Sequence, residues 1–271
     1  MSPLFRNSSS RDREVILHYH FFKCAGTSVE HVLHEHFGKE LIRLDQELPF
    51  ARIFASEVLL ELEKNSSVKA VTSHQLRMPV PEKKGYNFIP VLFFRHPLDR
   101  IRSVYFFDKN RGPVTPDARM ACENNFSDYI RQQIKMNKQA VNFHLKNVTD
   151  AWDQETQTLL PIGTDNHLAR ALEILDALPV VGVVERYSES AKAYENLISS
   201  AFPDFKFPVK TSNVGPNRQG NLQNRLETMC EEIGESLYKE LEEINYADFA
   251  LYQAANTHLD SVITRQRDAN D

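Results

Sequence analysis

The sequence predicts a three-layer α/β fold, with a central parallel sheet and helices on both of its faces. Short apolar runs alternate along the chain with amphipathic segments, which is typical of parallel strands connected by helices. The run Ile89–Phe94 is continuously apolar, which indicates a central strand covered on both faces. Because ligands of such sheets bind at the carboxyl ends of the strands, the residues that follow each strand are the first candidates for function.

The first expected unit is a strand, a tight turn and a helix. Val15–Lys23 is rich in β-branched and aromatic residues, which favours a strand. Small residues follow, and an amphipathic pattern that favours a helix begins at Thr27. We expect Thr27 or Ser28 to cap this helix, because a hydroxyl oxygen accepts hydrogen bonds from the free N–H groups of a first turn.

The rest of the chain continues the alternation. We expect strands at Val68–Ser73, Ile89–Phe94 and Pro179–Val184, because each of these runs is short and apolar. Amphipathic patterns predict helices at Glu57–Lys64, from Leu98 onward, in a long region Asp117–Leu145, and at Asp165–Ala177, Ser188–Ala201, Leu222–Ile233 and Asp248–Val262. Phe202–Gln223, with three prolines and two glycines, is expected to be a long ordered loop.

Length and composition indicate one globular domain over residues 1–271, with loose tails at residues 1–13 and 265–271. The 32 basic and 37 acidic residues give a net charge of −5, so no overall positive field recruits nucleic acid or an anionic membrane. Three scattered cysteines argue against a disulfide framework or a zinc site. No apolar run approaches the ~20 residues of a membrane span, and the polar start is no signal peptide, so we expect a cytoplasmic protein.

The turn after the first strand, Lys23-Cys24-Ala25-Gly26-Thr27-Ser28, has the residues of an anion-binding loop. A helix N-terminus attracts phosphate or sulfate through its free N–H groups and its dipole, and the lysine adds a mobile positive charge. The loop is not a Walker A motif, because that motif places its lysine after the glycines. Taken alone, the same residues also fit a plain strand-to-helix connection.

A second basic stretch follows the apolar strand Ile89–Phe94. Arg95 comes directly after the strand, Pro97 suits the first turn of a helix, and Ser103 lies eight residues after Arg95. A guanidinium group binds a phosphate dianion through paired charged hydrogen bonds, and a hydroxyl group adds another. Taken alone, Arg95 also fits a surface arginine in a strand-to-helix turn.

In type, order and separation, these two motifs resemble those of the sulfotransferases that use 3′-phosphoadenosine 5′-phosphosulfate (PAPS). K-C-A-G-T-S resembles the family's 5′-phosphosulfate loop, although Phe22 stands where a proline is usual. R-x-P-x-x-R-x-x-S-x-Y resembles the motif in which an arginine and a serine clamp the 3′-phosphate, which assigns that role to Arg95 and Ser103. The resemblance implies a P-loop-like fold, PAPS as co-substrate without a metal, and nucleotide contacts from Lys23, Cys24, Ala25, Gly26, Thr27 and Ser28.

Weaker similarities extend the resemblance over almost the whole chain. The V-G-x-x-E stretch that ends at Glu185 is similar to the family's turn near the adenine, which implies a contact from Arg186. Thr211–Arg218 is similar to the loop that folds over the nucleotide, which implies a role for Arg218. The chain most resembles the carbohydrate-type branch, which includes the uronyl 2-O-sulfotransferases and bacterial relatives.

Sulfuryl transfer needs a cation near the bridging oxygen and a base that takes the proton of the acceptor. Lys23 fits the first role. His74 fits the second, because it follows an expected strand and because its T-S-H turn resembles the family's catalytic turn. A histidine at a strand end is also often structural, and Glu30 and His96 are the other candidates for the base.

Two further features have a structural interpretation. His18 and His20 share a strand face, and we expect a core role for them rather than metal ligation. Cys24 lies beside a lysine and a helix N-terminus, an environment that lowers the pKa of a thiol. Without a partner histidine, however, it is expected to be a loop residue and not a nucleophile.

Three functions remain open at this point. The leading one is a PAPS-dependent sulfotransferase that acts on a hydroxyl of a sugar, a lipid or a small metabolite. A nucleotide-kinase-like phosphotransferase is the alternative, although G-K-[ST] and an obvious strand-end aspartate for Mg²⁺ are missing. The third is a non-catalytic nucleotide-binding scaffold of the same fold. The presence of Lys23, His74, Arg95 and Ser103 together argues against it, because a scaffold needs none of them.

Overall fold

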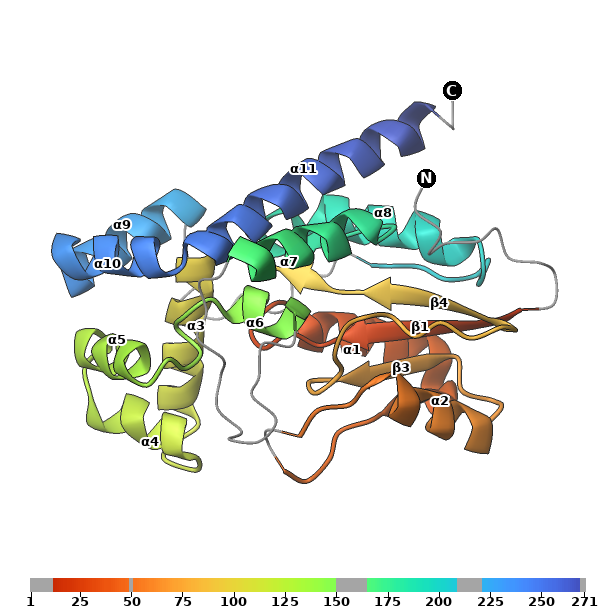
Figure 1. Ribbon diagram of the computed structural model, residues 1–271, viewed down its shortest axis with the longest axis horizontal. Helices are drawn as coiled ribbons and strands as arrows, with labels where there is room; N and C mark the ends of the chain where they lie inside the picture. The colour runs from red at the N-terminus through yellow and green to blue at the C-terminus, as the bar shows by residue number, and fades with distance from the viewer. Residues whose placement is uncertain (1–11, 49–50, 150–164, 209–220, 269–271) are drawn as a thin grey trace.

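The protein is built around a parallel sheet, as the computed structural model of residues 12–48, 51–149, 165–208 and 221–268 shows (Figure 1). In these ranges four strands lie in the order β2-β3-β1-β4, namely β1 (Arg13–Tyr19), β2 (Leu41–Arg43), β3 (Ala70–Ser73) and β4 (Tyr86–Val91). The short strands β5 (Phe93–Phe94) and β6 (Gly182–Val183) form a second parallel pair. Helices flank the sheet, so the predicted fold class is confirmed.

β1 lies inside the sheet, between β3 and β4, and is aligned with both of them. It pairs with β3 and β4 on its two sides, with Tyr19 opposite Ser73 and His18 opposite Val91. The N–H of His20 donates to the carbonyl oxygen of Ser73 at 3.0 Å. The residues that follow β1 and β3 therefore emerge side by side at one edge of the sheet.

Helices cover the sheet and form a second group beside it (Figure 1). α1 packs against β1, β2 and β3, whereas α8 and α11 pack against β6. The helices are α1 (Gly26–Phe37), α2 (Ala55–Lys64), α3 (Pro97–Asn110), α4 (Pro116–Glu123), α5 (Phe126–Lys135), α6 (Phe143–Thr149), α7 (Asp165–Ala177), α8 (Tyr187–Ser199), α9 (Leu222–Ile233), α10 (Glu235–Ile244) and α11 (Tyr246–Asp268), with short 3₁₀ turns at Gly38–Glu40 and Val184–Arg186.

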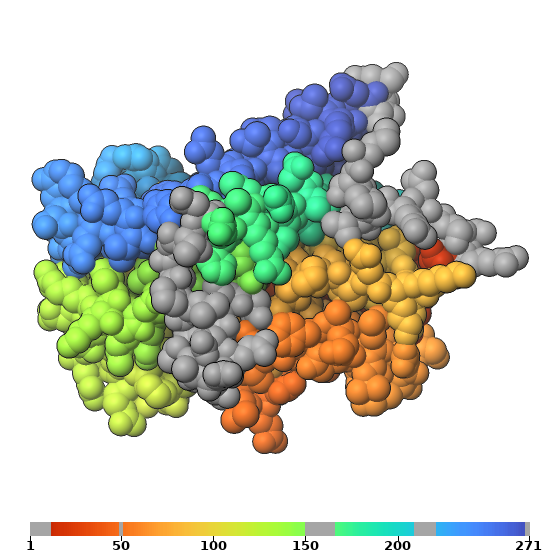
Figure 2. All heavy atoms as spheres, in the orientation of Figure 1, coloured from red at the N-terminus to blue at the C-terminus, as the bar shows by residue number. Residues whose placement is uncertain are grey.

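The buried apolar side chains of the sheet and the helices form two cores. The larger one joins β1, β3, β4 and β5 to the helices over the sheet. The smaller one joins α3, α4, α5, α9 and α10, and includes Leu98, Tyr105, Tyr129, Met229 and Leu241. On the surface, α9 and α10 lie against the α4–α5 region at the left of the molecule (Figure 2). α3 belongs to both parts, because it begins at the sheet and ends in the second core.

The predicted strand Ile89–Phe94 is interrupted at Leu92. The Tyr194 hydroxyl accepts a hydrogen bond from the N–H of Leu92 at 3.1 Å and lies 2.8 Å from its carbonyl oxygen, which also accepts from the N–H of Gly182. The Tyr194 side chain and the N–H of Gly182 in β6 thus satisfy the peptide groups of Leu92, between the pairing of β4 with β1 and that of β5 with β6. The strand predicted at Pro179–Val184 is correspondingly reduced to the two residues of β6.

The sequence predicted one long helical region at Asp117–Leu145. This prediction is wrong in one respect, because the region is divided into three helices, α4, α5 and α6. The Asn125 side chain caps α5 by accepting from the N–H of Asp128 at 2.9 Å. Asn137 and Asn142 have positive φ angles of 48° and 41°, which asparagine tolerates better than most residues. Each of these asparagines therefore breaks the helical path.

Both predicted tails are shorter than expected. Arg13 already belongs to β1, and its guanidinium group donates to the carbonyl oxygens of Leu62, Asn65 and Val68 at 2.7–2.8 Å. At the other end α11 continues to Asp268. Residues 209–220 of the predicted loop Phe202–Gln223 lie outside the described residues. None of the helices in the described ranges combines the length and the apolar character that crossing a membrane requires.

Candidate active site

The loop between β1 and α1 is the first part of the candidate site. β1 ends at Tyr19, before the predicted end at Lys23, and α1 begins at Gly26. Lys23 and Ala25 adopt left-handed backbone conformations, with φ angles of 62° and 63°. Left-handed residues in such a turn direct successive N–H groups toward one side, which is the geometry of an anion-binding concavity.

Thr27 and Ser28 do not cap α1, contrary to the prediction. Ala25 is the N-cap residue and provides no side-chain hydrogen bond, and the two hydroxyl residues lie inside the first turn. Ser28 instead hydrogen-bonds to the side chain of Tyr187, the first residue of α8. The N–H groups of Ser28 and Val29 instead donate to the carbonyl oxygen of Ala25, at 2.9 and 3.2 Å.

Gly26 is required by the close approach of the His20 ring. A Cβ atom at this position would lie 1.8 Å from Cδ2 and 2.2 Å from Nε2 of His20. The ring is 6% exposed and has little room to move away. The glycine thus lets the histidine pack directly beneath the start of α1.

Arg95 joins the second motif to this loop. Its Nη1 donates to the carbonyl oxygen of Lys23 at 3.1 Å, and its Nε donates to Asp99 Oδ2 at 2.8 Å. Arg225, on α9, donates to both oxygens of the same carboxylate at 2.7 and 3.2 Å. Burial alone would raise the pKa of Asp99, but Arg95 and Arg225 outweigh it and lower that pKa to about 2. The carboxylate is therefore ionised and shared by two arginines.

The other residues of the two motifs lie close to this cluster or along α3. Ser103 is half-buried on α3. The Lys23 ammonium group lies over the ring of Phe107, 4.3 Å from its centroid. Cys24 is buried, and burial raises the pKa of its thiol to about 12, which corrects the expectation of a lowered value.

His74 lies where β3 ends, on the same edge as the loop. Its ring Nδ1 is 3.0 Å from the carbonyl oxygen of His20. A carbonyl oxygen only accepts, so Nδ1 carries the proton and Nε2 is the basic nitrogen of the neutral ring. The His74 ring packs against the His20 ring with a centroid distance of 3.8 Å, while the residue itself is exposed. The side chain is thus oriented by a buried neighbour and still accessible.

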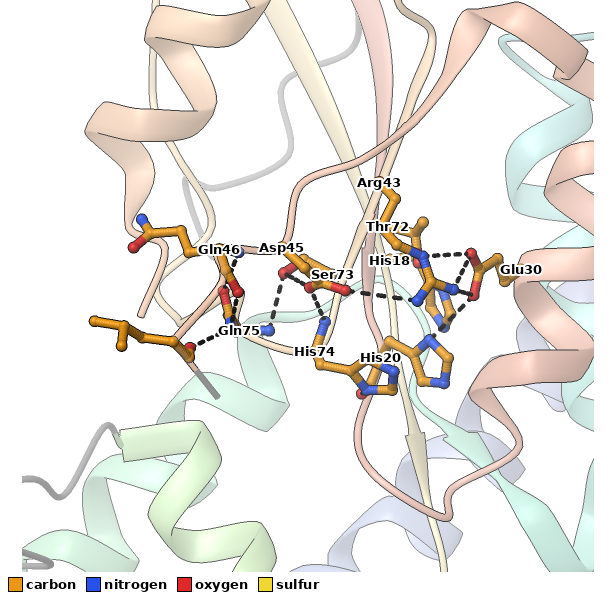
Figure 3. Close-up of polar contacts among 11 residues, drawn as sticks. His18, His20, Glu30, Arg43, Asp45, Gln46, Thr72, Ser73, His74 and Gln75 are labelled. Atoms are coloured by element: carbon orange, nitrogen blue, oxygen red, sulfur yellow. Dashed lines mark hydrogen bonds and ion pairs between the residues drawn. The ribbon is translucent and has the colours of Figure 1, made fainter. Parts of the chain in front are cut away.

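A polar network holds both histidines in place (Figure 3). Asp45 Oδ1 accepts from the backbone N–H of His74 at 3.0 Å and from the Ser73 hydroxyl at 2.8 Å. Arg43 lies 3.6 Å from Asp45 and donates through Nε and Nη2 to the carboxylate of Glu30. Glu30 in turn lies 3.4 Å from Nδ1 of His20. Ion pairs thus connect α1 with β2 and the segment after it, and the hydrogen bonds of Asp45 extend the network to the end of β3.

The other candidates for the base are less suitable than His74. The Glu30 carboxylate is engaged by Arg43 and by His20. His96 packs edge-on against Phe249 and Tyr252, and burial lowers its pKa to about 4. Burial likewise lowers the pKa of His18, to about 3, which keeps this neighbour of the site neutral.

Arg186 and Arg218, the other two arginines predicted to contact the nucleotide, are not found at the site among the described residues. The Arg186 guanidinium group binds Glu189 at 2.8 Å and Asp260 at 2.7 Å, and so connects α8 with α11. Arg218 lies outside the described residues. Glu185, next to Arg186, does reach the start of α3, because its carboxylate accepts from the N–H of His96 at 3.2 Å.

Sequence reasoning missed three charged residues of this region: Asp45, Asp99 and Arg225. Asp99 lies four residues after Arg95 on a predicted helix, and this spacing is a sequence signal for an ion pair. Asp45 follows β2, a strand of three residues that no pattern predicts. Arg225 lies 126 positions from its partner, so nothing local points to it.

Comparison with known proteins shows which family the chain belongs to. The family model described as the sulfotransferase family matches residues 8–253. The chain belongs to the sulfotransferase family. It is also 30% identical over 250 residues to an uncharacterized protein of Archaeoglobus fulgidus, covering 89% of this chain and 96% of that protein. The matched region of this sulfotransferase includes Lys23, His74, Arg95 and the other candidate residues.

The arrangement of the potential ligand side chains also bears on metal binding in this sulfotransferase. In the described ranges, no group of three or more His, Cys, Asp or Glu side chains is arranged to hold a metal ion. His18, His20 and His74 lie close together, but they stack ring against ring. Among the described residues, positive charge near the loop includes Lys23, Arg95 and the buried Arg100.

Proposed function

We propose that this sulfotransferase transfers the sulfuryl group of PAPS to an acceptor hydroxyl, as the carbohydrate-type branch does. PAPS supplies the sulfuryl group, and adenosine 3′,5′-bisphosphate (PAP) is the product that leaves. The observation that most supports the proposal is the hydrogen bond from Arg95 Nη1 to the Lys23 carbonyl oxygen, at 3.1 Å. It joins the two motifs that a nucleotide with phosphates at both its 3′ and 5′ positions requires.

Lys23 and the start of α1 are suited to stabilise the leaving phosphate. The helix N-terminus offers fixed N–H donors, and the lysine offers a charge on a flexible stem. That charge lies over the Phe107 ring, 4.3 Å from its centroid. A cation–π contact at an exposed ring stabilises by about 0.5–1 kcal/mol, so an arriving anion outcompetes it.

His74 is proposed to be the general base. As the acceptor oxygen forms its bond to sulfur, the bond from sulfur to the bridging oxygen breaks, and the acceptor proton moves to Nε2 of His74. The other ring proton stays on Nδ1, which continues to donate it to the carbonyl oxygen of His20, 3.0 Å away. The Asp45 carboxylate holds the backbone N–H of His74, and the Glu30 carboxylate lies beside the His20 ring that packs against His74 (Figure 3).

Two alternatives share the fold. A nucleotide-kinase-like phosphotransferase would use ATP with Mg²⁺, and the loop lacks the G-K-[ST] sequence of that class. A non-catalytic scaffold would bind the nucleotide without turning it over. The exposed, oriented His74 argues against the scaffold, because nucleotide binding alone does not require a basic nitrogen at that edge.

Radiolabelled PAPS with a panel of sugars, lipids and small alcohols provides the test. We expect labelled product and PAP with at least one acceptor, in a buffer that contains EDTA. ATP with Mg²⁺ should give no phosphorylated product with the same panel. Phosphoryl transfer from ATP would establish the kinase alternative, and PAP binding without any transfer would establish the scaffold.

A further inference from the structure

One buried carboxylate, that of Asp99, is shared by two buried arginines from distant parts of the chain. Arg95 Nη2 lies 2.7 Å from Asp99 Oδ2, and Arg225 Nε lies 2.7 Å from Asp99 Oδ1. The exposed fractions are 2% for Asp99, 7% for Arg95 and 9% for Arg225. The carboxylate thus fixes the position of both guanidinium groups.

The charges of this cluster indicate what Arg225 contributes to it. Arg95 and Asp99 form a pair with no net charge, and a neutral pair stabilises an incoming phosphate dianion poorly. Arg225 adds a second positive charge to the pair. Glu185 is the other carboxyl group nearby, and its oxygens accept from the N–H of His96 and the hydroxyl of Tyr252 at 3.2 Å each.

The packing of α9 explains how Arg225 is held there. Arg225 lies in the first turns of α9, whose N-cap is Asn221. Met229, one turn later, is fully buried in the smaller core together with Leu98, the residue before Asp99. α9 thus packs against α3 through this core, with Arg225 facing Asp99.

We propose that Arg225 is a specificity-determining residue for the 3′-phosphate of the nucleotide, which it serves by holding Asp99 and by adding the second buried positive charge beside Arg95. This inference rests on the proposed use of PAPS. It assigns to helix α9 a part of the nucleotide site that neither motif contains. A ligand with a single 5′-phosphate would gain little from it.

Affinities for PAP and for adenosine 5′-phosphate, measured by calorimetry on the full chain, test the proposal. Arg225→Gln removes the charge and should weaken PAP binding about tenfold or more, the effect of one lost charged interaction. Adenosine 5′-phosphate should bind within about twofold of wild type. Arg225→Lys keeps the charge but loses the forked contact with Asp99, so it should fall between the two. Arg131→Gln, at an exposed ion pair on α5, is the matched control.

The ratio of the two affinities separates specificity from a structural role. An arginine that only stabilises the fold would weaken both nucleotides alike or lower the melting temperature alone, and either result overturns the inference. Should Arg225→Gln fail to fold, Arg225→Lys decides, because an unchanged affinity ratio in that variant overturns the inference as well. A wild-type protein that binds PAP no more tightly than adenosine 5′-phosphate overturns the proposed function itself.

Discussion

Arg95 donates a hydrogen bond from Nη1 to the carbonyl oxygen of Lys23 at 3.1 Å, across 72 positions of sequence. Arg95 follows β5 and Lys23 lies in the loop after β1, so the contact joins two strand ends. Lys23 has a φ angle of 62°, and the contact holds its left-handed peptide in place. The arginine proposed for the 3′-phosphate therefore also shapes the loop proposed for the 5′-phosphosulfate.

This double role predicts a large effect of Arg95→Ala. The variant loses both the phosphate contact proposed for Arg95 and its support of the loop, so PAP affinity should fall on the order of 30-fold or more, equivalent to ~2 kcal/mol or more. Ser103→Ala removes one neutral hydroxyl and should cost less than tenfold. Calorimetric titration with PAP gives both values. Equal affinities of Arg95→Ala and wild type would show that the second motif is wrongly assigned.

Gly26→Ala should disturb the site through His20. The added Cβ would lie 1.8 Å from the ring, and overpacking of this kind costs about 1–3 kcal/mol. We expect a lower free energy of unfolding in urea and a loss of turnover. The double variant Gly26→Ala, His20→Ala removes the clash and should regain much of the lost stability. No gain in the double variant would mean that the ring is not the obstacle.

His74→Gln should lose turnover while it keeps its affinity for PAP. A positioned general base contributes roughly 10²–10⁴-fold to the rate. The role proposed for His74 concerns the acceptor and not the nucleotide, so kcat should fall by that factor and the dissociation constant of PAP should stay within about twofold. The residual rate should rise with pH, as deprotonated acceptor replaces the base. Near-normal turnover would assign His74 a structural role.

Acid should destabilise the protein through His144, which is fully buried and lies 3.1 Å from the Arg95 carbonyl oxygen. Burial lowers its pKa to about 4, whereas the unfolded chain keeps the ordinary value of 6.5. Between these values the unfolded state binds the extra proton, so stability falls as the pH falls, by about 1.4 kcal/mol per pH unit. The contribution is fully present above pH 6.5.

His144→Gln isolates this contribution, because the amide keeps a hydrogen-bond donor and does not titrate. Urea unfolding at about pH 7.5 and about pH 5 should show a loss that is ~2 kcal/mol smaller in the variant than in wild type. His18 and His96 titrate in both proteins and cancel in the comparison. An equal loss in the two proteins would contradict a buried neutral His144.

Local patterns were sufficient for β1, β3 and β4 of the sheet and for several helices, but not for β2. The apolar run before the loop predicted β1, and α7 lies at Asp165–Ala177 as its amphipathic pattern indicated. The errors lie where a tertiary contact decides the backbone. Tyr194 interrupts the strand at Leu92, and the positive φ of Gly234 separates α9 from α10, a helix that was not predicted.

The site was predictable where its residues follow strands. Because parallel strands end at one edge, the positions of Lys23, His74 and Arg95 in the sequence were enough to expect that they converge. The ring stacking of His20 under His74 and the two arginines on Asp99 were not predictable. These contacts depend on side-chain packing between residues that are far apart in sequence.

The most direct test of PAPS-dependent sulfuryl transfer at this site is a calorimetric titration of the wild-type protein with PAP in a buffer that contains EDTA. We predict saturable binding that PAPS displaces and that ATP with Mg²⁺ does not, and that is about 30-fold or more weaker in Arg95→Ala. Absence of PAP binding, or its displacement by ATP with Mg²⁺, would contradict the account.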